Sequence, residues 1–246
     1  MKAYATLFRM ELLAWLRVPL NLFFIVAWPV LWLVMMTLVI PGVERGMAGD
    51  DLLFFFPSCM ALVCLSAMTS LSIRIAIKKE AGVLRRLKAV PFPTGAYLAV
   101  QFACSVAMSL LGLACIGLVA VAMRMHPRGS LLAAGILFLL ECFVFSVLGF
   151  LVAGVSRRIA TANIVSMLVM FFMMFLSDMF IPVSDPESIV FRIGRWLPAQ
   201  PFLAATRGIL LSGARLGDYV PQIAVMAAWG VFGLVVSLLT FRFDSK

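Results

Sequence analysis

Long apolar stretches separated by short polar segments dominate the pattern of this chain. Six of the stretches are long enough to cross a bilayer, because about 20 apolar residues in a helix span a hydrocarbon core roughly 30 Å thick. They are residues 20–41, 52–73, 95–123, 131–155, 160–181 and 219–240. The pattern therefore predicts an all-α integral membrane protein with six transmembrane helices in one domain, residues 1–246.

Residues 1–18 precede the first span and have a helical pattern of their own. Four apolar side chains recur at helical spacing, namely Tyr4, Phe8, Leu12 and Trp15. Basic residues lie roughly opposite, which predicts an amphipathic helix in the headgroup region. Glu11 falls on the apolar side, so a frayed start to the chain remains the alternative.

Residues 187–213 are partly apolar but do not have the pattern of a membrane span. Prolines and arginines interrupt the apolar residues, which predicts short re-entrant or interfacial helices. Acidic and basic residues gather around this segment: Asp178, Asp185, Glu187, Arg192, Arg195 and Arg207. Their predicted role is to hold the short helices at the outer leaflet, and a solvated loop is the alternative.

Composition and charge support the membrane assignment and orient it. Hydrophobic residues make up 64% of the chain and charged residues 13%, far from the roughly 45–50% and 25% of soluble domains. With the N-terminus inside, the inner segments hold 13 basic and three acidic residues, whereas the outer segments hold seven of each. This asymmetry predicts both termini in the cytoplasm. It also accounts for the net charge of +9 without a nucleic-acid partner.

The segment 78–91, which follows the second span, concentrates this charge. On a helical wheel one arc is apolar, comprising Ile77, Val83, Leu84, Leu87 and Val90. The other arc is basic, comprising Lys78, Lys79, Arg85, Arg86 and Lys88. A short amphipathic helix from about Gly82 to Pro91 is predicted, suited to a groove on a partner protein. Binding to anionic lipid headgroups is the alternative.

Within the spans, Glu141 is the acidic residue that most needs an explanation, since a charge at a span centre costs about 2.5–3.5 kcal/mol on insertion scales. It is predicted either to face a cavity and meet substrate or a proton, or to be protonated and bonded to Gln101 or Ser105. The fifth span is rich in Phe and Met, which suits an adaptable binding surface but also ordinary packing. The predicted substrate pathway is Glu141, Phe171, Met174, Phe175 and Asp178.

Signals of catalysis are missing from the sequence. The five cysteines all fall in predicted spans without CxxC spacing, which argues against a disulfide framework or a metal site. The single histidine, His126, lies in a predicted outer loop, and no HExxH, GxSxG or Walker A motif occurs. We therefore expect no catalytic residue, no bound cofactor and no ATPase in this chain.

The whole arrangement resembles the ABC-2 type permeases, the membrane subunits of ATP-binding-cassette exporters. The loop pattern is Glu80, Gly82, Leu84, Leu87 and Pro91. Further matches are Phe56-Pro57, then Phe180-Ile181-Pro182, and Leu197-Pro198 with Pro201 and Arg207. One departure is that Pro198 and Pro201 stand where the family more usually shows an Asn-Pro pair.

The resemblance implies a partner and a site. The coupling helix would dock a cytoplasmic ATPase through Lys79, Glu80, Gly82, Val83, Leu84, Arg85, Arg86 and Leu87. An outer gate would include Pro182, Pro198, Pro201 and Arg207. Two ATPase copies, with their ATP and Mg, and a second permease would complete the complex, a homodimer being favoured over a heterodimer.

The same resemblance implies a multi-pass protein of the bacterial inner membrane that exports an amphipathic or hydrophobic compound. Export of a polysaccharide or glycolipid is the alternative cargo. In a different class, Glu141 would serve an ion-coupled secondary transporter.

Overall fold

The computed structural model describes residues 2–39, 50–83, 94–156, 158–179 and 189–240, and these parts of the chain contain helices and turns but no strand. The helices are α1 (Lys2–Leu16), α2 (Pro19–Leu22), α3 (Trp28–Val39), α4 (Asp50–Glu80), α6 (Thr94–Ala122), α7 (Leu131–Val155), α8 (Ile159–Leu176), α9 (Ile189–Gly194), α10 (Ala199–Ser212) and α11 (Val220–Thr240). Six segments are long and apolar enough to cross a membrane. The all-α membrane fold is therefore confirmed.

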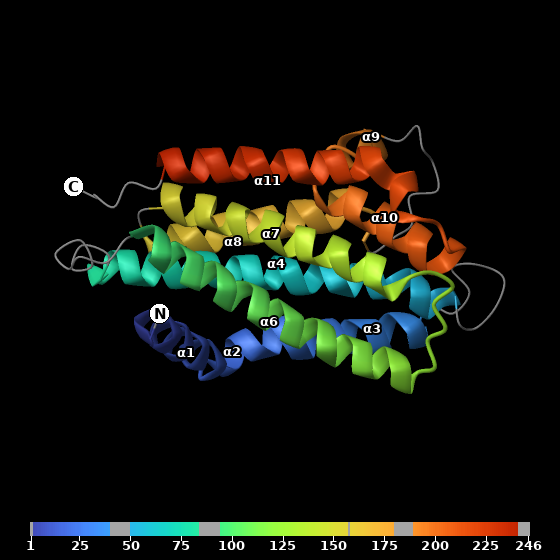
Figure 1. The fold of residues 1–246 in the computed structure, drawn as a ribbon, viewed down its shortest axis with the longest axis horizontal. Helices are drawn as coiled ribbons and strands as arrows, with labels where there is room; N and C mark the ends of the chain where they lie inside the picture. Colours follow the sequence, from blue (N-terminus) through green and yellow to red (C-terminus); the bar gives the residue numbers. More distant parts are fainter. Residues whose placement is uncertain (1, 40–49, 84–93, 157, 180–188, 241–246) are drawn as a thin grey trace.

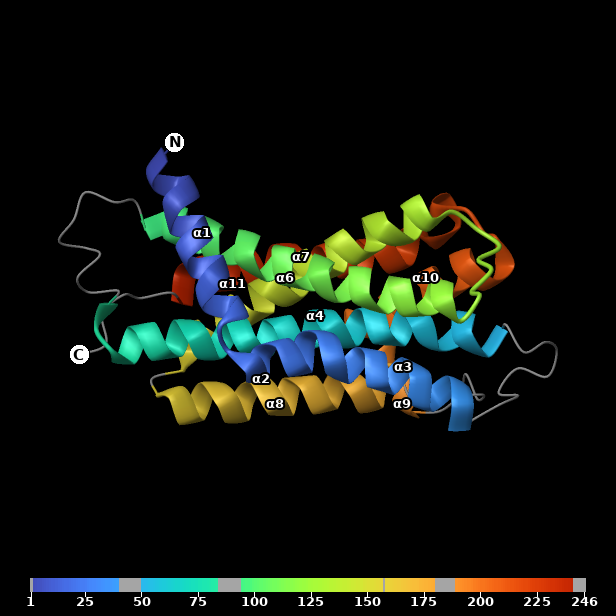
Figure 2. The ribbon, with the colours of Figure 1, turned by 90° about the horizontal axis from the view of Figure 1, so that it is seen from below.

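Helices α4 and α7 form the centre of the bundle. Helix α4 packs against α3, α6, α7, α8 and α10, and α7 packs against both α4 and α11. In their most apolar windows, 78% of α4 and 72% of α7 is buried, compared with 17% of α8 and 22% of the last span. The views in Figures 1 and 2 agree, with α4 running the length of the molecule between its neighbours.

A small residue lets the two central helices approach closely. A Cβ added to Gly149 of α7 would lie 3.1 Å from the carbonyl oxygen of Met68 on α4. The Ser72 hydroxyl donates to the Gly149 carbonyl at 2.9 Å, across the same contact. Small residues and short hydroxyls are the usual means by which helices approach each other in a bilayer, where the hydrophobic effect does not drive their association.

Helix boundaries differ from the predicted spans in three places. Helix α4 continues to Glu80, beyond the predicted end at residue 73, and α8 stops at Leu176, before the predicted 181. The first span is interrupted by a π-helical turn, Phe23–Ala27. Pro29 follows this turn and has no N–H for the Ile25 carbonyl, so an α-helical bond cannot form there.

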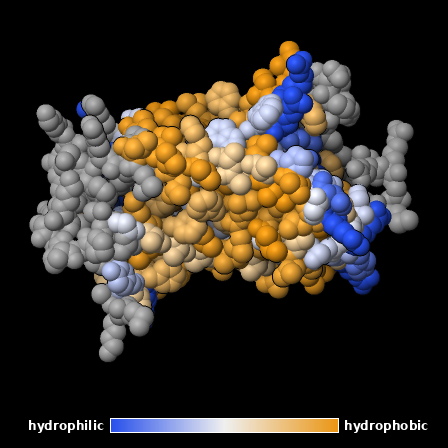
Figure 3. Space-filling view, turned by 45° about the horizontal axis from the view of Figure 1, so that its top comes forward, coloured by the Kyte–Doolittle hydropathy of each residue, from blue (hydrophilic) through white to orange (hydrophobic). Residues whose placement is uncertain are grey.

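The two ends of the bundle differ in character. Helix α1, the last turns of α4 and the C-terminal end of α11 lie at one end, and α9 and α10 lie at the other (Figure 1). Between them the surface is a broad hydrophobic belt, bordered by hydrophilic residues at the α9 and α10 end (Figure 3). The shape fits a protein that crosses a bilayer along its long axis.

Candidate functional site

The last turns of α4 bind α1 through a cluster of charges. Glu11 of α1 forms ion pairs with Lys78 and, at 3.8 Å, with the Arg74 guanidinium. Arg74 also donates to the Ala14 carbonyl at 3.2 Å and lies 5.0 Å from the centre of the Trp15 ring. Trp15 is fully buried. Residues 2–16 are thus a packed helix, so the frayed alternative is wrong, and Glu11 lies on the apolar side because its cationic partners are there.

The next residues of α4 bind two other helix ends. The Lys79 amine donates to the carbonyls of Gly154 at 2.9 Å and Ser156 at 3.0 Å, where α7 ends. The Glu80 carboxylate accepts the Ile159 amide at 3.0 Å, where α8 begins. A cation at a helix C-terminus and an anion at a helix N-terminus are each attracted to the partial charge of the helix dipole at that end. Lys79 and Glu80 therefore hold the α7–α8 connection.

We call Glu11, Arg74, Lys78, Lys79 and Glu80 the inner junction, after the predicted topology. The inner junction also reaches α6. The Lys78 amine lies 5.3 Å from the centre of the Tyr97 ring, near the start of that helix. The end of α4 is consequently in contact with α1, α6 and the α7–α8 connection at once.

Gly82 ends α4 in a defined way. Its φ is +68°, in the left-handed region that favours glycine, and its amide donates to the Lys79 carbonyl at 3.2 Å. Gly82 is also the residue at which the sequence predicted the docking helix to begin, and that helix stays a prediction. Val83 is the last residue described before a gap. Four predicted docking residues lie outside the described residues: Leu84, Arg85, Arg86 and Leu87.

At the opposite end of the bundle, Arg207 of α10 is buried in a cluster that we call the outer lock. Its guanidinium bonds the Asp178 carboxylate at 2.9 Å, the Asp178 carbonyl at 2.9 Å and the Ser58 hydroxyl at 3.0 Å. Its Nε donates to the Phe54 carbonyl at 3.2 Å, and its charge lies 3.9 Å from the centre of the Phe54 ring. The outer lock joins α10, α4 and the turn after α8.

The pairing explains how a charge can be buried there. An isolated guanidinium in an apolar interior is very costly, but one with a carboxylate and several hydrogen bonds is tolerated. Asp178 adopts a φ of +58°, an uncommon conformation that aims both its carbonyl and its carboxylate at Arg207. The solvated-loop alternative is therefore wrong for these two residues.

Of the other predicted gate residues, Pro198 occupies the N-cap position of α10, and Pro201 is buried in its first turn, where a missing N–H is harmless. Pro182 lies outside the described residues. Their role in a gate stays a prediction.

Glu141 is fully buried beside the α4–α7 contact, next to Cys142, whose sulfur is 3.5 Å from that of Cys64. Neither carboxylate oxygen has a hydrogen-bond partner among the described residues. Gln101 donates to Tyr97 and Ser105 accepts from Ser146, so neither of the predicted partners is bonded to Glu141. That structural explanation is wrong for this conformation, while a functional role stays a prediction.

The Phe and Met residues of α8 divide between two faces. Phe171 and Phe175 are 47% and 72% exposed and their rings stack at 6.5 Å, whereas Met174 is buried. The two phenylalanines thus lie on a face that the described residues leave exposed, and Met174 belongs to the core. The structure does not bring Glu141 and this exposed face together.

Sequence reasoning missed the partners of several residues. The signal for Glu11 was present, because an acid on the apolar side of a helix requires a buried cation. The sequence analysis used Arg74 only as one of the basic residues of the inner segments. Nothing in the sequence pattern marked Ser58 or Tyr97 as a partner of a charged residue. Among the described residues, no group of three His, Cys, Asp or Glu side chains could hold a metal ion.

Comparison with known proteins agrees with this arrangement. Residues 2–211 match the family model of the ABC-2 type transporter membrane domain. A comparison with curated protein sequences finds no match. The family match extends from α1 to α10 and so includes both the inner junction and the outer lock. The chain belongs to the ABC-2 type transporter family, and it is a membrane permease component rather than the ATPase.

Proposed function

We propose that this chain is the permease subunit of an ATP-driven exporter, in which two copies pair and bind two cytoplasmic ATPase subunits. The inner junction is the observation that supports this function most strongly. It joins the end of α4, from which the predicted docking segment continues, to α1, α6 and the α7–α8 connection. A push from an ATPase on that segment would be passed to most of the bundle.

The proposed cargo is an amphipathic or hydrophobic compound. Support comes from the second half of α8, where the exposed side chains include three apolar aromatic rings, Phe171, Phe172 and Phe175. If two permeases meet along this face, Phe171 and Phe175 would line a soft apolar path. The bacterial inner membrane is the proposed location.

The test is the coupling ratio, measured as transport per ATP hydrolysed by the complete complex in proteoliposomes. We expect Leu87→Asp to lower this ratio several-fold, because a carboxylate replaces a predicted apolar docking residue. Glu80→Ala should do the same by releasing the start of α8. Asp244→Ala is the matched control, as it removes an acid from the C-terminal segment and should leave the ratio unchanged. Normal coupling in both variants, at normal abundance, would refute the docking role.

The Glu141 carboxyl, which has no hydrogen-bond partner in the described parts of the chain, favours a second function, transport coupled to an ion gradient. A buried acid without a hydrogen-bond partner is suited to gaining and losing a proton. If this function is correct, a pH gradient alone drives uptake into vesicles lacking the ATPase, and Glu141→Gln abolishes it. Transport that requires ATP and is unaltered by Glu141→Gln would exclude it.

A further inference from the structure

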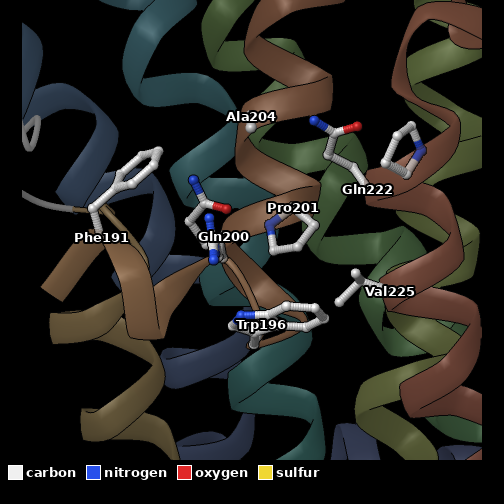
Figure 4. A pocket seen from close by; sticks show the side chains of 9 residues that line it. Phe191, Trp196, Gln200, Pro201, Ala204, Gln222 and Val225 are labelled. Atoms are coloured by element: carbon white, nitrogen blue, oxygen red, sulfur yellow. The ribbon is translucent and has the colours of Figure 1, made fainter. Parts of the chain in front are cut away.

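A groove opens between α9, α10 and α11, at the end of the bundle away from the inner junction. Its volume is about 470 Å³, within the range of small-molecule sites. Figure 4 shows Phe191 on one side, Gln222 and Val225 of α11 on the other, and Trp196 and Gln200 between them. The Trp229 indole of α11 donates to the Trp196 carbonyl at 2.6 Å, which fixes one wall of the groove to the other.

Two arginines place positive charge at the groove and at the hollow next to it. Arg195 lines it and lies 5.7 Å from the centre of the Trp196 ring. Arg192 lines an adjoining hollow of about 340 Å³ that shares Arg195 and Trp196. Within the parts of the chain that the structure describes, neither guanidinium has an ion-pair partner. Two cations one helical turn apart, neither of them paired with an acid among the described residues, favour a bound anion.

The groove also holds a hydrogen-bond acceptor without a donor. The side-chain oxygen of Gln222 is buried and has no partner among the described residues. A buried amide oxygen left unpaired costs about 1–3 kcal/mol, so a ligand with a hydroxyl donor would recover this energy. The rest of the lining is mostly apolar, including Phe191 and Val225.

The surroundings place this groove where lipid headgroups meet acyl chains. Ile189, Ile193 and Trp196 are 74%, 48% and 61% exposed, although they lie beside the two arginines. Exposed apolar side chains next to Arg and Trp are typical of an interfacial helix, with the cations reaching toward the headgroups. The space-filling view likewise shows the hydrophobic belt ending in hydrophilic residues at this end (Figure 3).

We propose that the groove binds an anionic phospholipid with a hydroxylated headgroup. Its phosphate lies on Arg192 and Arg195, a headgroup hydroxyl donates to Gln222, and an acyl chain follows Val225 and Phe191. Only one part of this proposal rests on the proposed function, namely the side of the membrane: in the topology of the exporter, the groove lies in the outer leaflet. The test below uses binding rather than transport, so its failure is distinguishable from failure of the exporter proposal.

The test is quenching of Trp196 fluorescence in the full permease by lipids with brominated acyl chains. The Trp196 contribution is the difference between the parent protein and Trp196→Phe. We expect brominated phosphatidylglycerol to quench it at about a tenfold lower mole fraction than brominated phosphatidylcholine. The double variant Arg192→Gln, Arg195→Gln should lose this preference. Arg124→Gln, at the same end of the bundle, should retain it.

Two further arms identify the ligand. Gln222→Leu should lower the preference for phosphatidylglycerol over phosphatidylmethanol, which has the same charge but no hydroxyl, about fivefold. Soluble glycerol phosphate should not relieve the quenching, because it lacks the acyl chain. Equal quenching by the two brominated lipids, an unaltered preference in the double arginine variant, or displacement by glycerol phosphate would overturn the proposal.

Discussion

A few charged residues form ion pairs and hydrogen bonds inside the otherwise apolar bundle of this permease. Arg207 is the clearest case, since hydrogen bonds to Asp178, Ser58 and Phe54 and a contact with the Phe54 ring leave little of its charge unmatched. Glu11 is the equivalent at the opposite end of the bundle, bound to Lys78 and Arg74. Each pair joins helices that are distant in sequence, so each residue acts on more than its own helix.

Arg207→Ala should destabilise the protein by about 3 kcal/mol, because it leaves the Asp178 carboxylate without its cation in a largely buried place. The measurement is thermal unfolding of the purified protein in detergent. Arg207→Ala combined with Asp178→Ala should recover part of the loss, since no unpaired charge remains. An unfolding temperature equal to that of the parent protein in the single variant would contradict the outer lock.

At the scale of the element, the end of α4 is the important feature. The sequence predicted that Gly82 weakens a continuous helix and that the charged docking segment begins at residue 78, after a span that ends at residue 73. The helix in fact continues to Glu80, because Lys78, Lys79 and Glu80 all find partners on neighbouring helices while α4 remains helical. Such partners come from tertiary contacts, which the pattern of one segment does not contain.

The left-handed conformation of Gly82 gives a prediction for this element. Gly82→Ala should cost about 1 kcal/mol and favour continuation of α4, which would misdirect the docking segment. The coupling ratio of the complex should fall. Gly82→Asn is the matched variant, because asparagine tolerates the left-handed region, and it should retain most of the coupling. Equal ratios in the two variants would mean that the turn at Gly82 has no role in docking.

At the scale of the whole molecule, composition and hydropathy were sufficient to predict the number of spans and the all-α fold, and the prolines were sufficient to predict the broken helices near residues 187–213. The outer lock was beyond prediction, because Arg207 lies 29 residues from Asp178 and 149 from Ser58, and many pairings of the outer charges were equally plausible. The π-helical turn in the first span also depends on a local detail, the missing N–H of Pro29.

The exposed faces of the bundle lead to a prediction about assembly. If two permeases meet along α8, Phe175→Cys should form a disulfide-linked dimer in a chain whose five native cysteines are replaced by alanine. Leu118→Cys on α6 is the control, as this residue is similarly exposed on another helix and should give no cross-link. The readout is non-reducing electrophoresis of membranes after mild oxidation. Dimers from Leu118→Cys alone would place the interface elsewhere.

The most direct test of the account is the accessibility of a cysteine at position 87, in the cysteine-free chain, to a membrane-impermeant maleimide. Leu87→Cys should be unlabelled in intact cells, labelled in permeabilised cells lacking the ATPase, and protected when the ATPase is present. Ser212→Cys, exposed at the end of α10, should be labelled in intact cells. Labelling of Leu87→Cys in intact cells, or equal labelling with and without the ATPase, would contradict both the topology and the docking role.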